Sequence, residues 1–200
     1  VGGPGVGKSR LVKDFVASLE DEAAVVRGRC LPYGDGITFW PLSEMARIVA
    51  GVEQEDSPEV AVAKLNDRLP PADDRAAVVD RLAAAINLSS ARFPVAELFW
   101  GGRRFLELLG QDRPVIAVVD DIHSAETTFL EWLEHVLDAS RSVPILVLCT
   151  ARHALLEEVP DWGERERSER VVLGPLTADD SAGLVRQLLG EAGLDEQILA

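Results

Sequence analysis

The sequence has few of the residues on which disulfide-stabilised, metal-binding and basic nucleic-acid-binding proteins depend. It contains two cysteines, Cys30 and Cys149, without the further Cys or His ligands that a metal site would need. Each ends an apolar run, so we interpret both as buried free thiols in a reducing compartment. Lys and Arg number 20 against 34 Asp and Glu, a net charge of −14. So acidic a chain argues against direct binding of nucleic acid or anionic lipid.

Long apolar runs are also lacking. None approaches the roughly 18–20 residues that span a bilayer, and no signal peptide is visible, so we expect a cytoplasmic chain without a membrane partner. Hydrophobic residues make up 47% and charged residues 27%, which excludes disordered and collagen-like classes. The chain opens on VGGPGVGKSR without an initiator Met, and we therefore expect a piece of a longer protein.

Strand-like and helix-like segments alternate along the chain. Continuous apolar runs typical of buried parallel strands occur at 23–30, 115–121, 145–152 and, more weakly, 170–176. Helical spacing occurs at 9–20, 73–86, 95–109, 127–137 and 177–189, the last with Thr177 and Asp180 as a capping pair. The stretch 41–110 has no convincing strand and predicts several helices. This alternation predicts an α/β fold with a parallel sheet and a helical insertion between its second and third strands.

The opening residues match the phosphate-binding pattern G-x-x-x-x-G-K-[ST] from Gly2 to Ser9. Glycines allow successive N–H groups to turn toward a phosphate, and the following helix presents its positive end. Lys8 is predicted to neutralise β- and γ-phosphate oxygens, and the Ser9 hydroxyl to ligate Mg²⁺. The strand that normally precedes such a loop is expected to be almost entirely missing, with Val1 its last residue. The predicted nucleotide-binding set is Gly2, Gly3, Pro4, Gly5, Val6, Gly7, Lys8, Ser9 and Arg10.

Two carboxylates end the run at 115–121. We assign Asp120 to the Mg²⁺ side and Asp121 to polarising the attacking water, a task more often given to Glu. Arg152 follows the next strand, whose end should share the same crevice, and is predicted to reach the γ-phosphate. Lys8, Asp120, Asp121 and Arg152 are therefore the candidate catalytic residues. His123 is either a neighbour of this site or a structural residue.

Six segments resemble the AAA-type ATPase domain of STAND signalling proteins: GGPGVGKSRL, GRCLPYGDGITFWPL, PVAELFWGGRRFLE, VVDDIHSAE, LCTARHALLE and LGPLTADD. They are most similar to bacterial multidomain regulators with an adenylate/guanylate cyclase domain and to large LuxR- and MalT-type transcriptional activators. The resemblance implies a three-layer P-loop NTPase that binds ATP or ADP with Mg²⁺ and switches slowly. Residues 2–9 would be its Walker A motif, Asp120 and Asp121 its Walker B motif, and Arg152 its sensor-1 arginine.

The same resemblance implies an organisation for the chain. An ATPase core would cover 1–175 and the start of a helical lid 176–200, with effector and sensor domains of the parent chain as partners. The resemblance also allows a homo-oligomer that forms in response to nucleotide. Relatives usually carry Trp where Ser124 stands.

The expected function is that of a slowly hydrolysing ATPase switch in a signal-transduction or transcription regulator. A nonhydrolysing nucleotide-binding scaffold is an alternative, favoured by Asp121 in place of Glu. A P-loop small-molecule kinase would need an acceptor pocket and an Arg-rich lid, for which the sequence gives no sign. A DNA-loading AAA ATPase is disfavoured by the net charge.

Overall fold

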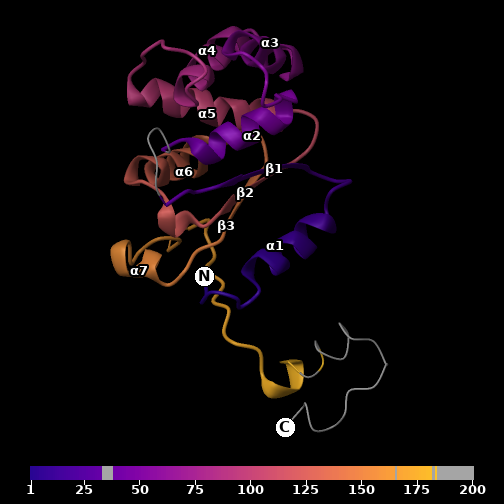
Figure 1. The fold of residues 1–200 in the computed structure, drawn as a ribbon, viewed down its shortest axis with the longest axis vertical. Helices are drawn as coiled ribbons and strands as arrows, with labels where there is room; N and C mark the ends of the chain where they lie inside the picture. The colour runs from indigo at the N-terminus through magenta and orange to yellow at the C-terminus, as the bar shows by residue number, and fades with distance from the viewer. Residues whose placement is uncertain (33–37, 165, 182, 184–200) are drawn as a thin grey trace.

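Three parallel strands form the sheet of the computed structural model, which describes residues 1–32, 38–164, 166–181 and 183 (Figure 1). Their order is β1 (Ala24–Arg29), β2 (Val115–Asp120) and β3 (Ile145–Cys149), with β2 in the centre. β2 is paired along its length with β1 on one side and β3 on the other, so the carboxyl ends of all three strands meet at one edge. The predicted α/β class is confirmed.

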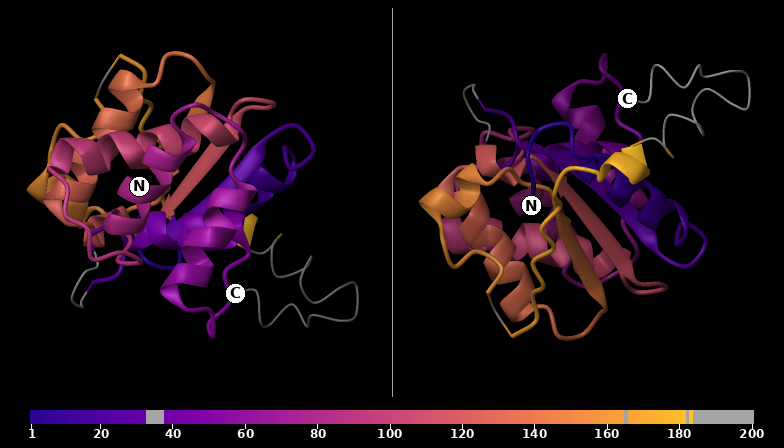
Figure 2. Two further views of the ribbon diagram at one scale, coloured as in Figure 1. Left: turned by 90° about the horizontal axis from the view of Figure 1, so that it is seen from above. Right: turned by 90° about the horizontal axis from the view of Figure 1, so that it is seen from below.

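Helices cover both faces of the sheet, as a parallel sheet requires (Figure 2). On one face, α1 (Lys8–Ala17) packs Val16 against a small cluster with Ile116 and Val118. The other face carries the main core, in which α2 (Trp40–Ala50), α5 (Val95–Leu109) and α6 (Thr127–Ala139) pack on the alternate strand residues, among them Ala117 and Val119. The near-continuous apolar character of β2 follows from this burial on both faces.

The helical insertion predicted at 41–110 is confirmed between β1 and β2, which are the second and third strands if the almost entirely missing strand before the phosphate loop is counted as the first. It consists of α2, α3 (Pro58–Arg68), α4 (Arg75–Ala85) and α5, with α3 against α2 and α4 against both α3 and α5 (Figure 1). Asp74 precedes α4, which begins two residues after the predicted start at 73; its carboxylate does not cap the helix and instead accepts a hydrogen bond from Arg104 Nε at 2.7 Å.

Glycines permit unusually close contacts between these layers. A Cβ built on Gly28 of β1 would lie 2.2 Å from the carbonyl oxygen of Pro41, so only glycine lets α2 sit so close to the strand. A Cβ on Gly102 would lie 2.8 Å from the Trp132 indole nitrogen of α6, and Gly101 allows an equally close approach of α4. The two adjacent glycines thus let α5 pack tightly between two neighbouring helices.

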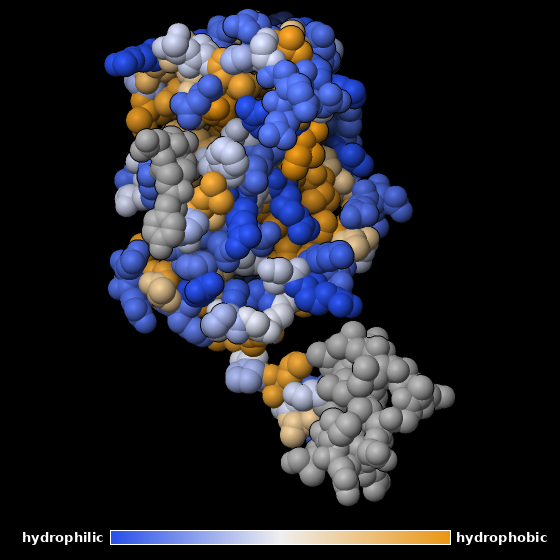
Figure 3. Space-filling model, in the orientation of Figure 1, coloured by the Kyte–Doolittle hydropathy of each residue, from blue (hydrophilic) through white to orange (hydrophobic). Residues whose placement is uncertain are grey.

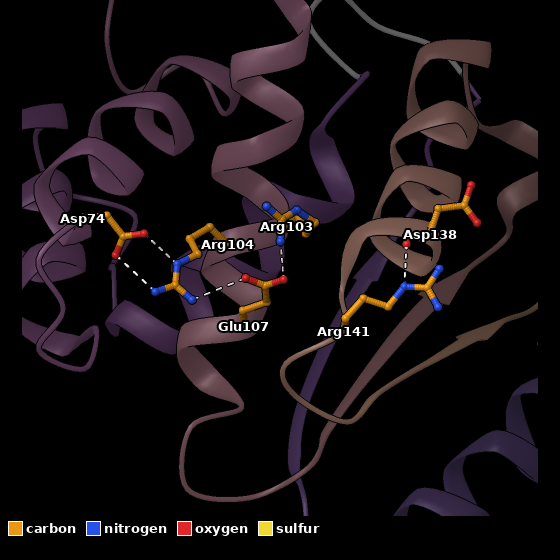
Figure 4. A network of polar contacts seen from close by, with 6 residues as sticks. All are labelled: Asp74, Arg103, Arg104, Glu107, Asp138 and Arg141. Atoms are coloured by element: carbon orange, nitrogen blue, oxygen red, sulfur yellow. Dashed lines mark hydrogen bonds and ion pairs between the residues drawn. The ribbon is translucent and has the colours of Figure 1, made fainter.

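A buried carboxylate ties α4 to α5 (Figure 4). The Glu107 side chain is 5% exposed and lies between the guanidinium groups of Arg103 and Arg104. Arg104 also bonds Asp74, and this contact holds the pKa of Asp74 below its usual value. Beside this network, Arg141 Nε donates to the Asp138 carbonyl oxygen at 3.0 Å. Burial makes the Glu107 contacts costly to break singly.

The N-terminus lies between β3 and a segment far along the chain. The Gly2 N–H donates to the carbonyl of Ala151 at 3.1 Å, and the Leu173 N–H donates to Val1 at 2.8 Å. Gly2 and Leu173 form an isolated parallel bridge. The strand predicted at 170–176 is therefore wrong as a full strand, because its neighbour is only the two residues Val1 and Gly2.

The last described segment begins a helix after Thr177. The Thr177 hydroxyl accepts from the Asp180 N–H at 3.1 Å and donates to its carboxylate at 2.6 Å, so the predicted capping pair is confirmed. The rest of the helix predicted to reach residue 189 lies outside the described residues, apart from residue 183.

Hydrophilic residues dominate the face in Figure 3, with apolar surface showing between them. No helix in the described part of the chain is both long and apolar enough to cross a membrane.

Candidate functional site

The phosphate-binding loop has the backbone that its glycines were predicted to allow. Gly5 (φ 75°) and Gly7 (φ 97°) are left-handed, a conformation that favours glycine. Gly7 is the N-cap of α1, which begins at Lys8, one residue before the predicted start. A Cβ built on Gly3, Gly5 or Gly7 would meet no atom within 4 Å. The loop surface is therefore open at the positive end of α1, where a phosphate chain fits.

The Lys8 side chain folds back over this loop. Its ammonium donates to the carbonyl oxygens of Gly2 at 2.9 Å and Gly3 at 2.8 Å. Ser9 is exposed in the first turn of α1, as a hydroxyl that contacts a metal must be. The guanidinium of Arg10 pairs with Asp14 one turn along the helix at 2.7 Å. The cation that the sequence predicts for the phosphates thus lies beside the loop.

Asp120 and Asp121 meet a common partner at the carboxyl end of the sheet. Asp120 is the last residue of β2, and one of its oxygens accepts from the Thr150 hydroxyl at 3.1 Å. The same hydroxyl accepts from the Asp121 N–H at 3.0 Å, and Thr150 is 3% exposed. Asp121 lies in the left-handed region, with φ 58°, and precedes the short turn η1 (Ile122–Ser124). Thr150 therefore ties the Asp120 carboxylate to the backbone of Asp121.

Arg29, at the end of β1, also contacts one of these aspartates. Its Nε and Nη2 lie 2.9 and 2.7 Å from Oδ2 of Asp121. Neither Arg29 nor Thr150 was predicted from the sequence as a site residue. The Arg29 backbone N–H in turn donates to Glu44 of α2 at 2.7 Å. A polar residue ending a strand that neighbours the carboxylate strand was the available signal for both Arg29 and Thr150.

His123 lies where the loop and the strand ends meet. Its side chain is 13% exposed, and Nδ1 is 4.0 Å from Oδ1 of Asp121. Burial lowers the pKa of His123; the Asp121 charge opposes this shift, while the charges of Arg152, Lys8 and Arg29 add to it. Of the predicted catalytic residues, Asp121 therefore lies nearest this histidine, and the charges of Lys8 and Arg152 also act on it. Arg152 is exposed and follows the residue whose carbonyl accepts the Gly2 N–H.

The two cysteines at the strand ends are free thiols, as predicted. Burial raises the pKa of Cys30 and of Cys149 to about 12. Because only the thiolate is an effective nucleophile or metal ligand, neither residue adds chemistry to the site at neutral pH.

The donor set suits a magnesium ion bound together with phosphates. Among the described residues no three His, Cys, Asp or Glu side chains gather to hold a metal. Mg²⁺ is commonly held by one or two protein oxygens together with substrate phosphates and water. A hydroxyl at Ser9 and a carboxylate at Asp120 are oxygen donors of this kind.

Comparison with known proteins gave two findings. Residues 1–148 match the family model described as the AAA ATPase domain. An uncharacterized protein of Rhizobium meliloti (strain 1021) is 27% identical over 191 residues, covering 90% of this chain and 18% of that protein. The chain thus spans about a fifth of the length of the curated relative it matches.

Proposed function

This chain belongs to the AAA ATPase domain family, and we propose that it is a slow ATP-driven switch of the STAND type within a multidomain signalling or transcription regulator. The observation that carries the proposal is the meeting of the open phosphate loop with the ends of β2 and β3. There the Gly2 N–H donates to the carbonyl of Ala151, the residue before Arg152, at 3.1 Å, and His123 lies 4.0 Å from Asp121. These contacts support a single site for phosphate-binding, carboxylate and cationic groups.

The loop residues would bind the nucleotide phosphates. Residues 2–10 form the binding segment, in which the N–H groups of the left-handed glycine loop and the end of α1 face the phosphates. Lys8 would exchange its two carbonyl partners for phosphate oxygens. Mg²⁺, when bound by Ser9 and on the side of Asp120, would screen the charge of the phosphates.

The carboxyl end of the sheet would carry the hydrolysis of ATP to ADP and phosphate. The oxygen of a water molecule bonds to the γ-phosphorus, and the bridging bond breaks with its electron pair left on the ADP oxygen. Asp121 orients this water and takes up its proton. Arg152 contacts the γ-phosphate oxygens and so distinguishes ATP from ADP. Aspartate at position 121 has a shorter side chain than glutamate, in keeping with a slow turnover.

The organisation of the protein around this site belongs to the same proposal. Residues 1–175 would form the ATPase core and 176–200 the start of a helical lid, of which only 176–181 and 183 lie within the described residues. Effector and sensor domains of a longer chain are the proposed partners, in the cytoplasm, without direct nucleic-acid contact by this segment. Its net charge of −14 supports the last point. Nucleotide-dependent self-association would couple the switch to its output.

A nonhydrolysing nucleotide-binding scaffold is the second candidate. One observation favours it: Arg29 occupies Oδ2 of Asp121 with two N–H groups, which competes with polarisation of water. Such a scaffold would bind ATP and ADP without turnover, whereas the switch releases phosphate in repeated cycles.

Nucleotide titration and phosphate-release assays test the proposal with three variants. Lys8→Ala should abolish binding of ATP or weaken it sharply, because the cation beside the loop is lost. Asp120→Asn should keep binding and lose Mg²⁺-dependent turnover. Lys13→Ala, on the exposed side of α1, is the matched control and should change neither. Unchanged ATP affinity in Lys8→Ala would contradict the assignment of the loop.

A further inference from the structure

The two oxygens of the Asp121 carboxylate have different neighbours. Oδ2 receives Nε and Nη2 of Arg29 at 2.9 and 2.7 Å. Oδ1 faces the imidazole of His123, with Nδ1 at 4.0 Å. The backbone of Asp121 is fixed separately, since its N–H donates to the Thr150 hydroxyl. Its side chain can still rotate the carboxylate plane, and the contacts of Arg29 and His123 with the two oxygens limit this rotation.

The surroundings of His123 determine which ring nitrogen must face the carboxylate as a donor. Nδ1 is buried and makes no hydrogen bond within the described part of the chain. The charged groups that act on the ring are one carboxylate, Asp121, and three cations, Arg152, Lys8 and Arg29. Cationic side chains have no acceptor to offer. A neutral ring with its proton on Nδ1 is therefore the form that Asp121 stabilises.

The distance leaves a small movement to be made. At 4.0 Å the contact is about 1 Å longer than an N–H···O hydrogen bond. His123 lies in the three-residue turn η1, directly after the left-handed Asp121, so both side chains belong to one short segment. A small adjustment of either side chain closes the bond.

We propose that His123 is a positioning residue for Asp121, donating from Nδ1 to Oδ1 while Arg29 holds Oδ2. The carboxylate plane is then fixed from both sides. This inference rests on the proposed ATP hydrolysis, in which Asp121 orients the attacking water. It gives His123 a role in turnover and none in nucleotide affinity.

Nitrogen NMR of the histidine rings tests the contact without any turnover. The chain has three histidines, so the His123 signals are assigned by their loss in His123→Asn. We expect the Nδ1–H form, and a shift of the Nδ1 signal in Asp121→Asn. Glu131→Gln, an exposed change on α6, is the control and should leave that signal in place. A neutral ring with its proton on Nε2, or an Nδ1 chemical shift that is unchanged in Asp121→Asn, would overturn the proposal.

Kinetics of three substitutions then separate positioning from packing. Asparagine places an amide nitrogen at the position of Nδ1, whereas glutamine places it at that of Nε2 and leucine offers no donor. We expect His123→Asn to keep kcat within a few-fold and His123→Gln and His123→Leu to lower it about 10- to 100-fold, with the Kd for ATP unchanged in all three. Equal losses in all three variants, or an undiminished rate in His123→Leu, would refute the role.

The two proposals fail in different ways. If the unaltered protein releases phosphate no faster than Lys8→Ala, hydrolysis is refuted, and the NMR result still decides the contact between His123 and Asp121. If it hydrolyses ATP but the NMR and substitution results are negative, only the role of His123 is refuted.

Discussion

Replacing Thr150 by valine would remove the hydroxyl that joins the Asp120 carboxylate to the Asp121 backbone, while keeping the shape of the side chain. The hydroxyl accepts from the Asp121 N–H at 3.0 Å and donates to the Asp120 carboxylate at 3.1 Å. Valine can do neither. We expect the substitution to lower both the stability of the fold and the rate of ATP hydrolysis.

The loss of stability can be worked from these two bonds. A hydrogen bond to a charged group contributes about 1.5–3 kcal/mol, and a buried N–H left without a partner costs about 1–3 kcal/mol. Thr150 is 3% exposed, so water cannot readily replace its hydroxyl. Because both aspartates are only half-buried, we take the lower part of each range and expect about 3 kcal/mol. In a chain of 200 residues, this lowers Tm by roughly 6–12 °C.

Thr150→Ser is the matched control, since it keeps the hydroxyl and loses one buried methyl group. It should cost about 1 kcal/mol, or roughly 2–4 °C in Tm. Thermal melts and phosphate-release assays are measured on both variants, and only Thr150→Val should lose turnover. If the two variants melt at the same temperature and hydrolyse ATP at the same rate, the hydroxyl does not hold the two aspartates and the reasoning fails.

Three further changes test other contacts. Gly28→Ala forces a Cβ into the α2 backbone and should cost about 3 kcal/mol or more in a urea titration, whereas Gly174→Ala, with open space around it, should change little. Arg29→Gln should alter the free energy of unfolding by less than about 1 kcal/mol, because this arginine is 66% exposed. The same substitution should lower kcat, because the Asp121 carboxylate becomes free to rotate. An unchanged kcat would count against a role of this contact in turnover. Burial lowers the pKa of His135, so the unfolded chain binds the proton first and stability should fall as pH drops below about 6.5. The urea midpoints at pH 7.5 and 5.5 should differ less in His135→Phe than in the unaltered protein.

The sheet and its helical insertion were predictable because their signals are local. The apolar runs of β2 and β3, each preceded by proline, predicted both strands, and α5 has the predicted bounds of 95 and 109. Burial on both faces imposes this pattern on any strand in such a position. The segment at 170–176 has a similar composition and forms only one bridge, since its pairing depends on the two residues Val1 and Gly2.

The site was predictable in its motifs and not in its contacts. The pattern from Gly2 to Ser9 and the two adjacent aspartates are recognisable in the sequence alone. Arg29 and Thr150 bond those aspartates from two other strands, and strand register in space, which sequence spacing does not reveal, brings them there. The turn of Lys8 onto its own loop depends on the same three-dimensional placement.

The bridge between Gly2 and Leu173 makes the phosphate loop and the C-terminal segment mechanically continuous. The Leu173 N–H donates to the Val1 carbonyl, and the helix after Thr177 starts only five residues further on, a tether of at most about 18 Å. A rotation of that helix beyond the slack of the tether pulls on the first turn of the loop, and a change in the loop pulls on the helix. A displacement of the segment at 171–173 is thereby passed directly to Val1 and Gly2 at the start of the loop.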